Sequence, residues 1–139
     1  MTKLLIAISF LIFVGSPFVN AEQVYYCTAE LATGFYKDKK TRKWGQANFQ
    51  KERYTIKFND DYTSLEGILD RNPWVCKKPY FGVMYEGALT CFDTNDNGDF
   101  FSFDRGTQVF VLMIGSVDGF LFPILKQETK LIAGDCKKF

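Results

Sequence analysis

The chain has 139 residues and contains no histidine. The absence of histidine removes the usual general base, the usual metal ligand and every Ser–His or Cys–His pair, which excludes most hydrolase mechanisms. With 17 basic and 16 acidic residues, the formal net charge is +1, so the total charge does not favour nucleic acid or an anionic membrane as a partner.

The first 21 residues have the pattern of a helical signal peptide. Lys3 provides a short basic start, and an apolar run follows from Leu4 to Val14. Val19-Asn20-Ala21 presents small or β-branched residues at the positions that a signal peptidase reads, so cleavage is expected after Ala21. This run is shorter than the roughly 20 apolar residues that a membrane span needs. We therefore expect residues 22–139 to be periplasmic or secreted, without a stable membrane anchor.

The mature chain is long enough for one domain, and it holds all four cysteines. An even number of cysteines in an exported chain is typical of a disulfide framework. Three pairings are open. We favour Cys27 with Cys136, which would join the first strand to the last, and Cys76 with Cys91, which would join neighbouring strands. A zinc site is disfavoured because the chain has no Cys-x-x-Cys pair.

Short apolar runs separated by turn signals follow one another along the mature chain. Strands are expected at or within 23–29, 35–36, 44–49, 53–58, 63–69, 74–76, 81–92, 100–103, 108–114 and 129–137, and residues 120–122 are an apolar run before Pro123. The run 53–58 alternates most clearly and places Tyr54, Ile56 and Phe58 on one face, which is typical of a sheet with one wet face. About eight to ten such strands predict an all-β fold, an antiparallel up-and-down barrel or a barrel-like sandwich.

Three strands at the centre of this fold are joined by two well-marked turns. Ala88–Phe92 ends at a turn rich in Asp and Asn, and Phe100–Phe103 ends at Asp104-Arg105-Gly106-Thr107, which suits a type I turn followed by a bulge residue. The third strand, Gln108–Ile114, is apolar at six consecutive positions. Such a run predicts a strand covered on both faces.

The turn after Phe92 also resembles the opening of an EF-hand calcium loop. Oxygen ligands at alternate positions can converge on one ion because a glycine, here Gly98, allows a sharp bend. The candidate ligands are Asp93, Asn95, Asn97, the Asp99 carbonyl and Asp104. The last ligand is Asp rather than Glu, and the flanks read as strands. The competing interpretation is therefore a plain turn, since Asp and Asn commonly cap turns.

A basic hairpin is predicted between Tyr36 and Trp44. Its cations beside aromatic rings could bind an anionic partner such as nucleic acid, a lipid head group or an acidic protein surface, and the alternative is a solvated tip. Since the mature chain has no net charge, nucleic acid is not expected. The candidate partner-binding residues are Lys39, Lys40, Arg42, Lys43 and Trp44.

No catalytic motif is present in the sequence. Ser64, Ser102 and Ser116 lie outside any Gly-x-Ser-x-Gly elbow, and no glycine-rich phosphate loop occurs. A small carboxylate-based hydrolase using Asp60, Asp61 or the acidic loop after Phe92 stays open as an alternative. The many aromatic residues either fill a small barrel or line a cavity for an apolar ligand.

Several short motifs are similar to those of small exported bacterial proteins of unknown function. They are Tyr25-Tyr26-Cys27, Gly34-Phe35, the alternating run 53–58 and the terminal Gly134-Asp135-Cys136-Lys137-Lys138-Phe139. The size and the two expected disulfides also resemble periplasmic lysozyme inhibitors, and this resemblance implies a small β-barrel. The expected function is a non-catalytic envelope protein that binds a protein or a small apolar ligand, with an inhibitor-type role as one form of this function. The alternative is a structural envelope protein stabilised by calcium.

Overall fold

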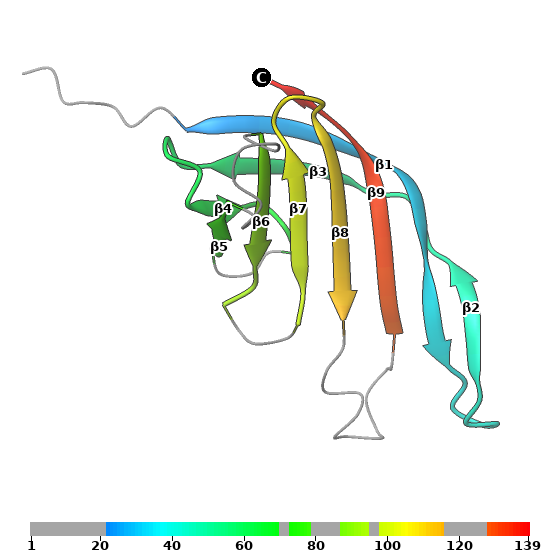
Figure 1. The fold of residues 1–139 in the computed structure, drawn as a ribbon. Helices are drawn as coiled ribbons and strands as arrows, with labels where there is room; N and C mark the ends of the chain where they lie inside the picture. The colour runs from blue at the N-terminus through cyan, green and yellow to red at the C-terminus, as the bar shows by residue number, and fades with distance from the viewer. Residues whose placement is uncertain (1–21, 70–72, 79–86, 95–97, 116–127) are drawn as a thin grey trace, which may run out of the picture.

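The computed structural model describes residues 22–69, 73–78, 87–94, 98–115 and 128–139. Within these ranges the chain forms strands and no helix, which confirms the all-β prediction (Figure 1). The strands are β1 (Gln23–Lys37), β2 (Trp44–Asn48), β3 (Arg53–Phe58), β4 (Ser64–Glu66), β5 (Trp74–Lys77), β6 (Ala88–Phe92), β7 (Phe100–Asp104), β8 (Val109–Gly115) and β9 (Glu128–Lys138). The predicted signal peptide, the segment 81–86 of a predicted strand and the apolar run 120–122 lie outside the described residues.

Eight of these strands close into a barrel. The sheet order is β2-β1-β3-β4-β5-β6-β7-β8-β9, and a further pairing of β1 with β9 joins its ends. Each described pairing is antiparallel, and apart from the step from β1 to β3 each strand of the ring pairs with the next along the chain. The fold is therefore a closed antiparallel barrel and not a sandwich. The ninth strand, β2, lies outside the ring.

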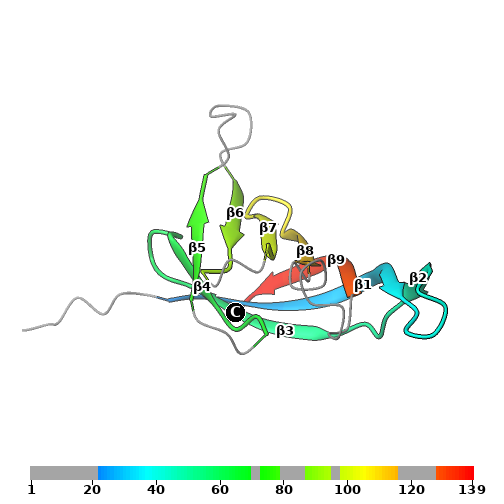
Figure 2. The ribbon, with the colours of Figure 1, turned by 90° about the horizontal axis from the view of Figure 1, so that it is seen from below.

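The long strand β1 belongs to the barrel in its first half and leaves it in its second. Gln23–Thr28 pairs with β3, whereas Thr33–Lys37 pairs with β2, and β9 runs along both halves. The register shifts between Ala29 and Leu31, so a β-bulge bends the strand there. The second half and β2 extend to one side of the barrel (Figures 1 and 2). The sequence analysis divided this strand at Gly34, and the structure shows one continuous strand.

Close approach of β1 and β9 at this bend depends on a glycine. A Cβ atom at Gly134 of β9 would collide with the backbone carbonyl of Thr28 in β1. The adjacent inward-facing positions of β1 are also small, Ala29 and Ala32. Small side chains therefore let the two strands meet tightly where β1 turns away from the ring.

Aromatic side chains fill the centre of the barrel. The largest fully buried side chains are those of Trp74, Phe58, Phe101, Phe103 and Phe110. The Phe58 and Phe103 rings stack with their centroids 5.4 Å apart, and those of Phe101 and Phe110 with centroids 5.7 Å apart. The sequence left open whether the aromatic residues fill the barrel or line a cavity for an apolar ligand. In the described barrel they pack in the core.

The strand β8 is not covered on both faces, and that prediction is wrong. Phe110 and Leu112 are buried, but Val109, the first residue of β8, is 43% exposed, and Val111 and Met113 are half-buried. Alternation along the strand sends these residues to the outer surface of the barrel. The apolar run thus reflects an apolar outer surface and not a second covering layer.

Two buried disulfides fasten the ring. Cys27 of β1 is bonded to Cys136 of β9, and Cys76 of β5 is bonded to Cys91 of β6. In both cases the two cysteines are direct cross-strand neighbours, and they are the pairs favoured from strand position. The two disulfides indicate an oxidising, extracytoplasmic environment. Across the described ranges, no helix is long and apolar enough to cross a membrane.

Candidate functional site: the hairpin of β1 and β2

The acidic turn between β6 and β7 has a structural role. Asp93 and Asp99 are 7% and 2% exposed. One carboxylate oxygen of Asp99 accepts a hydrogen bond from the backbone N–H of Gly115 at 2.7 Å, and the Asp99 carbonyl accepts one from the Asp93 amide at 3.3 Å. Asp99 thus ties this turn to the end of β8. Asn95 and Asn97 lie outside the described residues.

The structure places Asp104 at the opposite end of β7 from Asp93 and Asp99, and calcium binding at this turn stays a prediction. Strand β7 lies between Asp99 and Asp104 and spans about 13 Å from Phe100 to Asp104, since each extended residue advances about 3.3 Å. At the far end the Asp104 carboxylate accepts a hydrogen bond from the Gly106 amide at 2.8 Å, and this bond lowers the pKa of Asp104. No group of three or more metal-ligating side chains converges in the part of the chain that the structure describes.

The aspartates considered for a hydrolase also lie in a turn. The Asp61 carboxylate accepts hydrogen bonds from the Thr63 hydroxyl at 2.7 Å and the Thr63 amide at 3.1 Å. These bonds lower the pKa of Asp61. A general acid needs a raised pKa to hold its proton at neutral pH. Asp61 therefore has the electrostatics of a turn cap, and Asp60 beside it is exposed.

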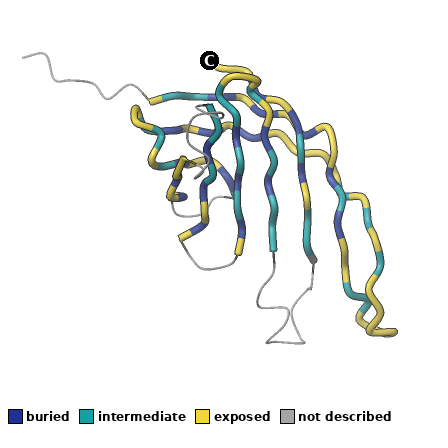
Figure 3. Tube along the Cα trace, in the orientation of Figure 1, coloured by how far each residue is buried: buried dark blue, intermediate teal, exposed yellow. Residues whose placement is uncertain are grey.

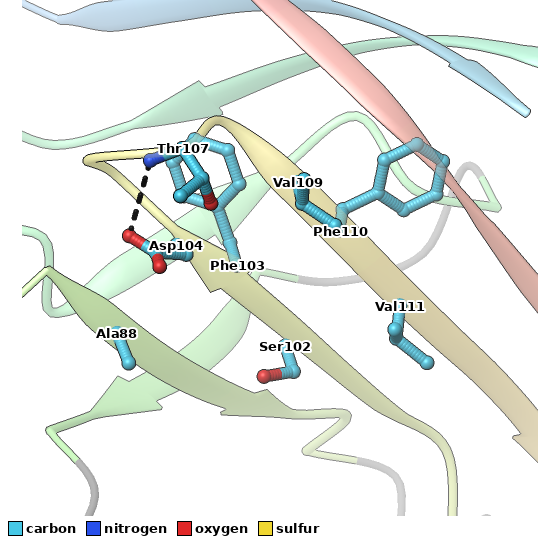
Figure 4. A pocket seen from close by; sticks show the side chains of 8 residues that line it. All are labelled: Ala88, Ser102, Phe103, Asp104, Thr107, Val109, Phe110 and Val111. Atoms are coloured by element: carbon cyan, nitrogen blue, oxygen red, sulfur yellow. Dashed lines mark hydrogen bonds between the residues drawn. The ribbon is translucent and has the colours of Figure 1, made fainter. Parts of the chain in front are cut away.

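A pocket of about 330 Å³ opens on the barrel surface beside the turn between β7 and β8 (Figure 4). Ala88, Val109 and Val111 contribute aliphatic surface to it. Its polar groups are engaged within the chain, because the Ser102 hydroxyl donates to the Leu89 carbonyl at 3.4 Å and Asp104 caps the turn. The pocket offers an open apolar surface and no nucleophile–base pair.

The tip of the hairpin joining β1 to β2 is built around Asp38. Its carboxylate accepts hydrogen bonds from the Lys40 amide at 3.0 Å, the Thr41 amide at 2.6 Å and the Thr41 hydroxyl at 2.9 Å. These bonds lower the pKa of Asp38, so the carboxylate stays charged and occupied by the turn. The Asp38 carboxylate thus bonds to groups of the turn itself. The exposed cations of the tip are Lys39, Lys40, Arg42 and Lys43.

Exposed apolar side chains lie directly behind this basic tip. Trp44 is 52% exposed, and the Lys37 ammonium lies 5.8 Å from the centroid of its ring. On the same outer face of β1, Phe35 is 56% and Leu31 is 65% exposed. Figure 3 shows that exposed residues dominate this extension, whereas buried residues alternate through the barrel strands. Cations and apolar rings therefore share one surface.

The sequence analysis found the cations and Trp44 but missed Leu31 and Phe35. The buried residues of β1 are Tyr25, Cys27 and Ala29 before the bulge, and Ala32 and Gly34 after it. The bulge thus reverses the alternation. A register shift of this kind is visible in the sequence only as a break in the period, which we interpreted as a break between two strands.

Comparison of the chain with models of protein families, with curated proteins and with solved structures gives no match. In the described chain the hairpin extension combines exposed cations with exposed aromatic side chains, and it projects from a closed, disulfide-bonded barrel.

Proposed function

We propose that the chain is a non-catalytic, exported binding protein of the cell envelope, periplasmic or secreted, that recognises a protein partner with the hairpin of β1 and β2. One observation carries the proposal: aromatic side chains fill the barrel, whereas large apolar side chains and cations are exposed on the hairpin. A filled barrel favours recognition through the outer surface over transport of a small apolar ligand in the interior.

The chemistry of the hairpin matches that of protein interfaces. Tryptophan and arginine are the residues that most often contribute the largest share of binding free energy, and Arg42 and Trp44 are two residues apart at the tip. Between Lys37 and Lys43 the chain carries five cations and one carboxylate, that of Asp38. Such a surface attracts an acidic partner and raises the association rate.

The test compares capture of envelope proteins by the exported, purified chain and by a variant of the hairpin. The variant combines Lys39→Glu, Arg42→Glu and Trp44→Ala. A control variant, Lys137→Glu with Lys138→Glu, alters exposed cations of β9 near the end of the chain. We expect a protein that the original chain and the control bind, that the hairpin variant does not bind, and that binds the chain directly after purification.

Two further measurements separate this proposal from its rivals. If the partner is an enzyme, an inhibitor-type role predicts that the chain lowers its activity and that the hairpin variant does not. Native mass spectrometry of the exported chain tests for a bound apolar ligand. Identical protein capture by the original chain and the hairpin variant, together with a bound lipid-like molecule, would show that the proposal is wrong.

A further inference from the structure

One edge of strand β2 has no neighbouring strand in the described chain. The strands of the ring have neighbours on both sides, whereas β2 pairs with β1 alone and ends the sheet order. In Figure 1 it forms the outer boundary of the extension, and in Figure 2 it lies at the end of the molecule. A free edge presents backbone N–H and C=O groups that can pair with another chain.

The register shows which backbone groups of β2 face outward. The Asp38 amide donates to the Lys43 carbonyl at 2.9 Å, and the Phe49 amide donates to the Ala32 carbonyl at 2.8 Å. Antiparallel strands alternate between pairs that exchange hydrogen bonds and pairs that do not. Gly45 and Ala47 therefore bond to β1. The residues between and beside them, Trp44, Gln46 and Asn48, direct their backbone groups away from β1.

This edge lacks the features with which proteins protect exposed strands. Such strands usually contain charged residues, a proline or a bulge. The sequence of β2 is Trp44-Gly45-Gln46-Ala47-Asn48, which has neither a charge nor a proline, and its pairing with β1 is regular. An incoming strand can therefore pair along its whole length.

We propose that the β2 edge binds an extended acidic segment of a protein partner as an added strand. This inference deepens the proposed function and rests on it. An added strand would run alongside Trp44, Gln46 and Asn48 and continue past the tip, where Lys39 and Lys43 are exposed and Asp38 is occupied by the turn. Backbone pairing supplies affinity, and the cations select acidic side chains.

Charge also argues against a second copy of this chain at the same edge. Antiparallel pairing of two β2 strands about Gln46 would place the basic tip of each copy beside residues 50–52 of the other, and Lys51 lies there. The acid of that segment, Glu52, accepts a hydrogen bond from the Tyr54 hydroxyl at 3.2 Å. Residues 50–52 would thus bring one cation and one carboxylate to each basic tip, whereas an acidic segment brings carboxylates alone, which the cations of the tip attract more strongly.

The first test is hydrogen exchange at single amides of the exported, purified chain, followed by NMR. In the free chain, the amides of Gly45 and Ala47 should be protected, and those of Trp44, Gln46 and Asn48 should exchange quickly. The probe is a blocked peptide of alternating Glu and Val at millimolar concentration. We expect it to protect Trp44, Gln46 and Asn48, while a matched peptide of alternating Lys and Val does not.

The second test is Gln46→Pro. Proline removes an outward N–H that β1 does not use, and the extended conformation of Gly45 suits a residue before proline. We expect the NMR spectrum of the barrel to be retained. The Glu/Val peptide should bind about tenfold more weakly, because one backbone hydrogen bond to the peptide is lost and the adjacent ones are displaced. Gln46→Thr keeps the N–H and should bind as the original chain does.

Other outcomes overturn the inference in distinguishable ways. Peptide-induced shifts at Trp44 and the lysines without alternating amide protection would exclude strand addition and leave the hairpin as a binding surface. Protection that rises with protein concentration without peptide would assign the edge to a second copy. Binding to vesicles of phosphatidylglycerol, but not to the Glu/Val peptide, would assign the hairpin to lipid and would also contradict the proposed protein partner.

Discussion

The barrel and the hairpin extension use the same long strand, β1, for opposite purposes. In the barrel, the side chains on one face of each strand are buried, and two disulfides join neighbouring strands. In the extension, Phe35 and Trp44 are more than half exposed, and the tip is held by hydrogen bonds to Asp38. The comparison teaches that stability and recognition are separated along one strand: changes in the barrel should alter the free energy of unfolding, and changes in the hairpin should alter binding.

The largest effect should come from the disulfide that closes the ring. Cys27 and Cys136 are 109 residues apart in sequence, against 15 for Cys76 and Cys91. Loop-closure entropy predicts a loss of about 5 kcal/mol for replacing the first pair by alanine and about 3 kcal/mol for the second. Urea unfolding of the two double variants measures the difference. If removal of the Cys76–Cys91 disulfide lowered the free energy of unfolding more than removal of the Cys27–Cys136 disulfide, loop-closure entropy would not be the main source of their stabilisation.

Truncation of the aromatic core should have the next largest effect. Phe101 is 1% exposed and stacks on Phe110, so Phe101→Ala should lower the free energy of unfolding by about 3 to 4 kcal/mol. The matched control is Phe35→Ala in the extension, where we expect a change within about 0.5 kcal/mol. Both are measured by urea unfolding. Similar losses in the two variants would show that the extension contributes to the core.

A smaller loss is expected at the turn between β6 and β7. Asp99→Ala removes the acceptor for the Gly115 amide, and an orphaned donor at a mostly buried position costs about 2 kcal/mol. Thermal unfolding measures this loss. The exposed Asp60 provides the control, since Asp60→Ala removes a carboxylate without burial. Equal melting temperatures for the two variants would show that Asp99 does not stabilise the barrel.

The smallest effect should be that of pH on the three turn carboxylates. Hydrogen bonds from turn amides and hydroxyls lower the pKa of Asp38, Asp61 and Asp104 in the folded chain. Their contribution is therefore complete above the unfolded pKa of about 3.9 and is lost as pH falls through the lower folded values. We expect a modest drop in melting temperature below about pH 4.

Hydrogen exchange at single amides distinguishes the contribution of Asp38 to the hairpin from the contribution of Asp104 to the barrel. Asp38→Ala should speed exchange at Lys40 and Thr41, whose amides bond to Asp38, and should leave the melting temperature of the barrel unchanged. Asp104→Ala, at the turn between β7 and β8, provides the comparison within the ring. Unfolding of the barrel by Asp38→Ala would break the division between the two regions.

The sequence by itself determined the features that depend on near neighbours. The alternation of 53–58 predicted the buried face of β3, and the Asp-Arg-Gly-Thr turn predicted the end of β7. The cysteine positions favoured the disulfide pairing because the first and last strands of a closed sheet must meet. These are consequences of strand period, turn conformation and the order of elements.

Only the tertiary structure decided what depends on distant pairing. Pairing of β1 with both β9 and β3 closed the ring and left β2 outside it, and the bulge after Ala29 turned Leu31 and Phe35 outward. Strand β7 placed Asp104 away from Asp93 and Asp99, although all three lie within one short segment. Register and closure are set by contacts across the whole sheet, so a local pattern cannot specify them.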